Sequence, residues 1–146
     1  MRIALVLAAL SLALPSACRA PAVETPIAFE REAAGQIGPV LEAKNLVARS
    51  AEEWRACCRG GAPALDAALD DFDWSKRMLI AVALGSRPSG GYSVEIVSVV
   101  AADSHWVVRA RETRPAPGSL QTAMVTSPFD CVSTPRFDGS VVFSFE

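Results

Sequence analysis

Few residue types that could carry out chemistry are present, and three of them could form a nucleophilic set. Cys131 supplies a thiol, His105 is the single histidine, and Asp103 or Asp130 could orient the imidazole. A thiol activated in this way is the arrangement of cysteine hydrolases. No strained nucleophile elbow surrounds Cys131, so a Cys-dependent hydrolase is the weakest of three functional hypotheses.

Metal and phosphate sites are not indicated by the spacing of the residues. The adjacent pair Cys57 and Cys58 is not a CxxC motif, and one histidine alone does not complete a zinc site. Residues 86–92 are glycine-rich, but a strand pattern follows them where a phosphate-binding loop needs a helix. We therefore expect no metal and no cofactor.

The cysteines could instead be structural. Either Cys57 or Cys58 could bridge to Cys131, which would close a loop of about 70 residues and stabilise the fold by roughly 4 kcal/mol in the chain-entropy model. Three buried thiols are the alternative, because free cysteine also behaves as a small apolar side chain. The sequence leaves both interpretations open.

The N-terminus has the pattern of an export signal. Arg2 precedes an apolar run over residues 3–14, and small residues follow up to Cys18. The run is too short to span a bilayer, so residues 1–17 are predicted to be a signal peptide of an exported bacterial protein. Cys18 stands where a lipobox has its lipidated cysteine, although Pro15 replaces the usual aliphatic residue. A membrane-anchored lipoprotein and a periplasmic protein cut nearby both remain open.

Length and charge restrict the remaining classes. The chain has 146 residues, enough for one domain after a leader. Its formal net charge of −2 and scattered basic residues provide no footprint for phosphate backbones. We therefore expect no nucleic acid among its partners.

Residues 78–100 hold the clearest structural pattern. Two apolar runs, residues 78–84 and 93–100, flank a loop rich in glycine and proline, which predicts two paired strands around an unusual turn. The first run is apolar on both faces, with its larger side chains on one face and Leu79, Ala81 and Ala83 on the other. Such a strand must be covered twice, so it is predicted to be central.

A capping box precedes this central strand. Ser50 and Glu53 have the spacing that satisfies the first amides of a helix, which predicts a helix of about nine residues ending at Gly60 and Gly61. Trp54, Cys57 and Cys58 would share one face. We expect Trp54 to fix the helix to the Ala-rich face of the central strand.

Further strands are predicted at residues 27–32, 45–49, 106–111, 120–127 with a continuation over residues 129–132 past Pro128, and 141–145, the last with Val141, Phe143 and Phe145 inward. The fold class is α+β and β-rich: a mainly antiparallel sheet of about seven short strands, curled or split into a sandwich, with one main helix packed on it. Residues 18–44 are predicted to hold a Pro-rich tether over residues 21–26 and a first strand. Residues 45–146 form the main domain.

The turn between the two apolar runs is the candidate binding site. Proline fixes one φ, two glycines can adopt positive φ, and arginine and tyrosine are enriched at interface hot spots. The turn is either a structural bend or a loop presented to a partner. Its residues are Arg87, Pro88, Ser89, Gly90, Gly91 and Tyr92.

The loop, the strand before it, residues 73–76 and residues 126–129 together resemble the C-terminal domain of the PrcB family. In that family the residues before the strand resemble Asp-Phe-Ser-Lys and the loop resembles Arg-Pro-Thr-Gly-Gly-Tyr; here Trp74 and Ser89 replace the Phe and the Thr. The resemblance covers roughly residues 45–145. It implies a noncatalytic exported protein of the bacterial envelope that binds or stabilises a partner, such as a protease complex.

A second resemblance supplies the remaining hypothesis. Residues 88–92 are similar to the Pro-Thr-Thr-Gly-Tyr loop of chagasin-like protease inhibitors. That resemblance implies direct inhibition of a protease instead of assembly with it.

Overall fold

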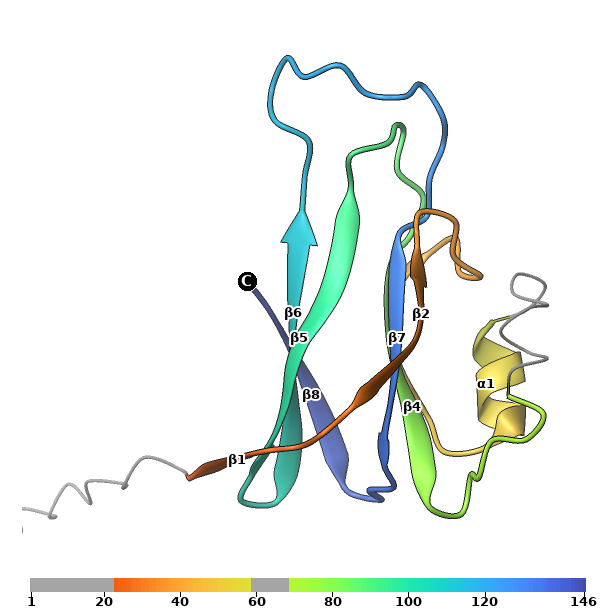
Figure 1. Cartoon of the computed structure of the whole chain (residues 1–146), viewed down its shortest axis with the longest axis vertical. Helices are drawn as coiled ribbons and strands as arrows, with labels where there is room; N and C mark the ends of the chain where they lie inside the picture. The colour runs from red at the N-terminus through yellow and green to blue at the C-terminus, as the bar shows by residue number, and fades with distance from the viewer. Residues whose placement is uncertain (1–22, 59–68) are drawn as a thin grey trace, which may run out of the picture.

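The computed structural model describes residues 23–58 and 69–146, and Figure 1 shows two facing sheets with one helix on the outside of one of them. The predicted signal peptide, Cys18, Gly60 and Gly61 lie outside the described residues. The described elements are β1 (Glu24–Pro26), β2 (Glu30–Gly35), β3 (Ala43–Ala48), α1 (Ala51–Cys57), β4 (Arg77–Leu84), β5 (Ser93–Ala102), β6 (His105–Thr113), β7 (Phe129–Pro135) and β8 (Ser140–Phe145).

The strands form a sandwich of two four-stranded sheets. Sheet A has the order β1-β5-β6-β8 and sheet B the order β2-β7-β4-β3. All pairs are antiparallel except β6 and β8, which run parallel. The predicted β-rich fold with one helix is confirmed.

Two apolar clusters hold these layers together. The inner core lies between the sheets and contains Met78, Ile80, Val82 and Leu84 of β4. The outer core lies between sheet B and α1 and contains Leu79, Ala81 and Ala83. Because β4 buries both faces and pairs with β3 and β7, the predicted central strand is confirmed.

The helix begins where the capping box predicts. The Glu53 amide donates to Ser50 Oγ (3.1 Å), while the Glu53 carboxylate accepts from the Arg49 amide (2.7 Å), one residue before the cap. The helix is seven residues long, and Trp54 is 2% exposed in the outer core. Within the described ranges, no helix combines the length and apolar character needed to cross a membrane.

The predicted pairing of the two apolar runs is wrong. The first run is β4 in sheet B, and the second is the start of β5 in sheet A, where its partners are β1 and β6. Residues 85–92 therefore cross from one sheet to the other. Alternating apolar residues show that one face of a strand is buried. They do not show which strand it pairs with through backbone hydrogen bonds.

The N-terminal predictions also change. Residues 24–26, expected within a tether, pair with β5 as β1. The strand predicted at residues 27–32 is interrupted, because the chain passes from sheet A to sheet B before β2 begins. Ile27 and Phe29 both pack against the inner core during this crossing, which produced the strand-like alternation.

Two further segments depart from their predicted structure. Residues 120–127 form no strand: residues 120–125 are exposed, and the backbone only bridges at Thr126 and Ser127. β7, expected only as a continuation of that strand, is instead central in sheet B. In β5, a bulge between Ile96 and Ser98 changes which residues face inward, so Val99 and Val100 are buried.

An ion pair within sheet B, between half-buried Arg31 of β2 and Asp130 of β7, binds the backbone of β5 in sheet A. Asp130 of β7 is fully buried, and its carboxylate accepts from Arg31 Nε (2.8 Å) and Nη2 (3.1 Å) and from the Ile96 amide (2.6 Å). Arg31 Nη2 also donates to the Ile96 carbonyl (3.2 Å). The ion pair stands next to the β5 bulge, so it ties the irregular part of sheet A to sheet B.

Candidate functional site

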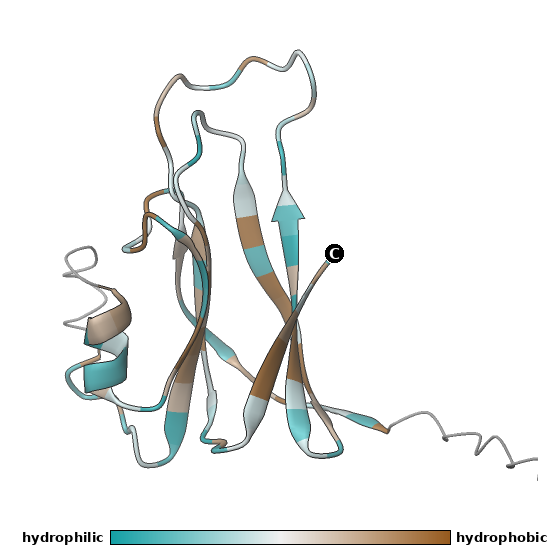
Figure 2. Cartoon of the chain, turned by 180° about the vertical axis from the view of Figure 1, so that it is seen from behind, coloured by the Kyte–Doolittle hydropathy of each residue, from teal (hydrophilic) through white to brown (hydrophobic). Residues whose placement is uncertain are grey.

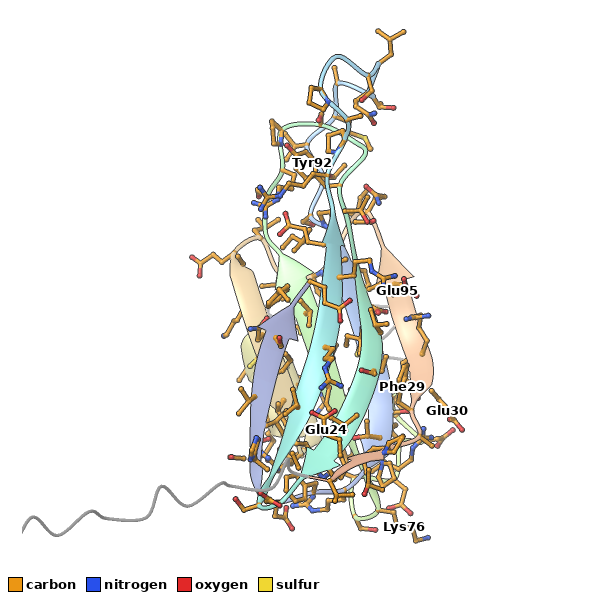
Figure 3. The ribbon with its side chains drawn as sticks, turned by 90° about the vertical axis from the view of Figure 1, so that its left-hand side faces the viewer. Glu24, Phe29, Glu30, Lys76, Tyr92 and Glu95 are labelled. Carbon is orange, nitrogen blue, oxygen red and sulfur yellow. The ribbon has the colours of Figure 1, made fainter. Side chains whose placement is uncertain are left out.

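Three connections meet at one end of the sandwich, and we refer to them together as the loop end: residues 36–42, 85–92 and 114–128. Figure 3 shows Tyr92 at this end, with Glu24 and Lys76 near the opposite end. The loop end therefore contains all six residues of the predicted binding loop.

Hydrogen bonds between the connections give the loop end a defined shape. Arg87 and Thr126 exchange two backbone bonds (2.7 and 2.9 Å), and Thr126 Oγ1 donates to the Ser89 carbonyl (2.9 Å). The Gly90 amide donates to the Thr122 carbonyl (3.0 Å). Ser127 accepts from the Gly38 amide through its backbone and its side chain. The predicted loop is thus held in place by hydrogen bonds to residues 114–128, another connection of the loop end.

Gly85 sets the direction in which the loop leaves β4. Its φ is +73°, a conformation that residues with a side chain rarely adopt. A Cβ at this position would come within 2.5 Å of the Ala43 backbone nitrogen. The close approach of residues 36–42 to the loop therefore requires glycine.

Arg87 and Tyr92, the two side chains expected to contact a partner protein, contact each other. The Arg87 guanidinium lies over the Tyr92 ring, 5.6 Å from its centroid, and Nη2 is 3.5 Å from Glu112 Oε1. Arg114 Nε donates to the same oxygen (2.9 Å), which raises the pKa of Arg114. Together with Ser86 and Pro88 they line a hollow of about 280 Å³.

One polar atom in this arrangement lacks a partner. Arg87 Nε is buried and has no hydrogen-bond acceptor within the described residues. A buried donor without an acceptor is costly.

Exposed apolar side chains gather on the loop end. Leu120 is fully exposed, and the set also contains Ile37, Leu41, Met124 and Val125. Exposed apolar side chains of this size are candidates for contact with a partner. Sequence reasoning missed Leu120, Met124 and Val125 because it assigned residues 120–127 to a strand. Their irregular spacing among Ser, Gln and Thr was the signal against a strand.

The residues of the hydrolase hypothesis do not come together. Cys131 lies in the outer core of sheet B, while His105 begins β6 in sheet A. Asp130 is engaged by Arg31, and Asp103 lies in the turn before His105. The described residues also contain no group of three His, Cys, Asp or Glu side chains arranged to hold a metal ion.

The three cysteines of the described chain are present as thiols. Cys58 and Cys131 belong to the outer core, and Cys57 is half-buried at its margin. Burial raises the pKa of the Cys131 thiol well above its ordinary value of 9.0, with nearby Cys58 as a second cause. The protonated thiol of Cys131 acts as an apolar packing group.

This burial predicts an alkaline instability. Above pH 9.0 the unfolded chain loses the Cys131 proton while the folded chain keeps it, so the free energy of unfolding should fall by about 1.4 kcal/mol per pH unit. Urea titrations at pH 8, 9.5 and 10.5 of the wild type and of Cys131→Ala measure it. The stability advantage of the wild type should shrink as the pH rises; two curves that stay parallel would contradict the burial of Cys131 as a neutral thiol.

Comparison with known proteins identifies the part of the chain around the loop. Residues 78–135 match the family model described as PrcB C-terminal, a span that runs from β4 to β7 and includes both long connections of the loop end. The resemblance inferred from the sequence is confirmed over this span. No curated protein and no solved structure matches the chain.

Proposed function

We propose that this PrcB-like chain is a noncatalytic binding protein of the bacterial envelope, which docks a partner protein on its loop end. The PrcB C-terminal match supports the class of protein. The family resemblance makes a protease complex the first candidate for the partner. Export depends on the signal pattern of residues 1–17, with a lipid on Cys18 as its anchored form.

The observation that carries the proposal is an apolar surface on a fixed frame. Leu120, Met124 and Val125 are exposed on a connection whose backbone is hydrogen-bonded to the loop 85–92. A frame that is already ordered loses little conformational entropy when a partner binds. Apolar side chains held in this way contribute binding energy through the area that they remove from water.

A paired substitution tests the loop end. Leu120→Asp combined with Val125→Asp should reduce recovery of the partner at least ~10-fold, because two charges would be buried in the interface. Val23→Asp is the matched control, since Val23 is also an exposed valine (82%) and lies outside the loop end. The measurement is quantitative affinity capture from envelope extracts of the producing bacterium, followed by mass spectrometry. Identical partner lists for all three proteins would refute docking at the loop end.

The same purified protein distinguishes assembly from direct inhibition. A docking protein should leave cysteine and serine proteases active at equimolar concentration, whereas a chagasin-like inhibitor should block one of them. Arg87→Ala combined with Tyr92→Ala then shows whether the guanidinium–ring contact takes part in either activity.

A further inference from the structure

β1 fixes the place at which the chain enters the sandwich. It pairs antiparallel with β5, and Glu24 lies opposite Ala102, the last residue of that strand. Because β5 runs from the loop end to the turn before β6, the chain enters at the opposite end, which we call the entry end. Figure 2, like Figure 1, shows β1 and the long connections at opposite ends of the molecule.

Contacts with two strands hold β1 in this position. Arg109 Nη2 of β6 donates to both carboxylate oxygens of Glu24 (2.6 and 2.7 Å). Just after β1, the Ile27 amide donates to the Val99 carbonyl of β5 (2.8 Å). β1 is therefore bound to β5 through its backbone and to β6 through a side chain, which keeps its first residue at the entry end.

The segment between Cys18 and β1 is shorter than the sandwich. Residues 18–24 cover at most about 20 Å even when fully extended. β5 has ten residues and spans about 30 Å, and the connections of the loop end extend beyond it. A chain attached to a membrane through a lipid on Cys18 therefore cannot turn over and place its loop end on the same membrane.

The loop end also lacks the charge that a membrane-binding surface needs. Apolar side chains that enter a membrane surface are usually accompanied by Lys or Arg, which attract anionic headgroups. The charged residues of the loop end are Glu42, Arg87 and Arg114, and both arginines contact Glu112. Its exposed apolar residues therefore belong to a surface without an excess of positive charge, which suits contact with an uncharged protein surface.

Both broad faces of the sandwich carry charges that disfavour contact with a bilayer. Sheet B is covered on its outside by α1, whose exposed residues include Glu52, Glu53 and Arg55. On the outer face of sheet A, exposed Glu95 and Arg111 lie opposite each other in the register of β5 and β6. Moving these groups out of water would be costly, which disfavours a sandwich that lies flat on the membrane.

We infer that the loop end faces away from the membrane that holds the Cys18 lipid, so the partner docks from the aqueous side with an uncharged, apolar protein surface. The docking surface then stands about 30 Å or more from the bilayer. The inference rests on the proposed function in its lipid-anchored form and names where the partner is met. A membrane surface is the alternative occupant of the exposed apolar side chains, and energy transfer distinguishes the two.

Fluorescence energy transfer on the lipidated protein in vesicles tests this arrangement. A non-natural residue that carries a donor dye replaces either Leu120 at the loop end or Ser104, an exposed residue at the entry end, and acceptor dyes label the lipid headgroups. The dye at position 120 should stand about 30 Å farther from the bilayer than the dye at position 104. Equal distances would mean that the sandwich lies flat, and a shorter distance at position 120 would mean that the loop end contacts the membrane. Either result overturns the inference.

The lipid is measured first, on the same preparation. Mass spectrometry of the N-terminal peptide should show a diacylated Cys18, and an unmodified cysteine would overturn the inference. Mature protein made without the signal peptide and the lipid should fail to sediment with vesicles of phosphatidylethanolamine and phosphatidylglycerol. Sedimentation that Leu120→Asp with Val125→Asp abolishes and Val23→Asp preserves would identify the membrane as the occupant of the loop end, which would also overturn the inference.

The affinity capture separates this inference from the proposed function. If the loop-end variant (Leu120→Asp with Val125→Asp) loses the partner while position 120 lies no farther from the bilayer than position 104, docking at the loop end stands and its orientation is refuted. If position 120 is the farther one and the loop-end variant still captures the partner, the orientation stands and the partner docks elsewhere.

Discussion

Replacing Asp130 with alanine is expected to lower the free energy of unfolding by about 3 kcal/mol, because it removes a fully buried carboxylate that joins both sheets. The Ile96 amide would lose its acceptor beside the β5 bulge, and Arg31 would lose two hydrogen bonds. Urea unfolding followed by tryptophan fluorescence measures the loss.

Two controls decide whether the ion pair is responsible. Asp138→Ala removes an exposed carboxylate paired with Arg136 and should cost less than ~0.5 kcal/mol. Arg31→Met leaves the Asp130 charge buried without its partner, so it should also be strongly destabilising. A double-mutant cycle on Arg31 and Asp130 should return a coupling of about 1 kcal/mol or more; additive effects would mean that the contact contributes nothing specific.

Truncating Trp54 to alanine is expected to cost about 3–5 kcal/mol, the largest single effect that we predict. Trp54 is the large buried side chain of α1, and it packs in the outer core with Leu79, Ala81 and Cys131. Without the indole a cavity remains over the small Ala residues of β4, which cannot move to fill it. Thermal and urea unfolding with a far-ultraviolet readout measure both the stability and the helix signal.

The exposed neighbour Arg55 supplies the control for this substitution. Arg55→Ala changes the same helix on its solvent side and should alter the stability by less than ~0.5 kcal/mol. Trp54→Phe should lose less than Trp54→Ala, because it keeps much of the apolar volume. If Trp54→Ala lost no more than Arg55→Ala, the helix would not be anchored through the indole.

Structural features that depend only on residues close together in the chain were predictable from the sequence. The two apolar faces of β4 follow from alternation within residues 78–84, and the start of α1 follows from Ser50 and Glu53. Residues 85–92 carried the resemblance to the PrcB C-terminal domain, whose family model matches residues 78–135. These signals are local because side-chain alternation and amide capping depend on residues a few positions apart.

Strand partners and the loop end were decided by tertiary structure. Asp130 shows no local sign of being buried, and its partner Arg31 stands 99 positions earlier in the chain. Likewise, the crossing of residues 85–92 between sheets, the parallel pairing of β6 with β8, and the bond from Arg87 to Thr126 all join distant segments.

The same distinction between local sequence signals and tertiary structure applies to the binding surfaces. From the sequence alone, Arg87 and Tyr92 were expected to face a partner, whereas in the structure they contact each other and Leu120 and Val125 are exposed instead. The physical reason is that exposure belongs to the packed arrangement of several segments. A residue type determines what a side chain can bind, and the fold determines which side chains are left open to bind it.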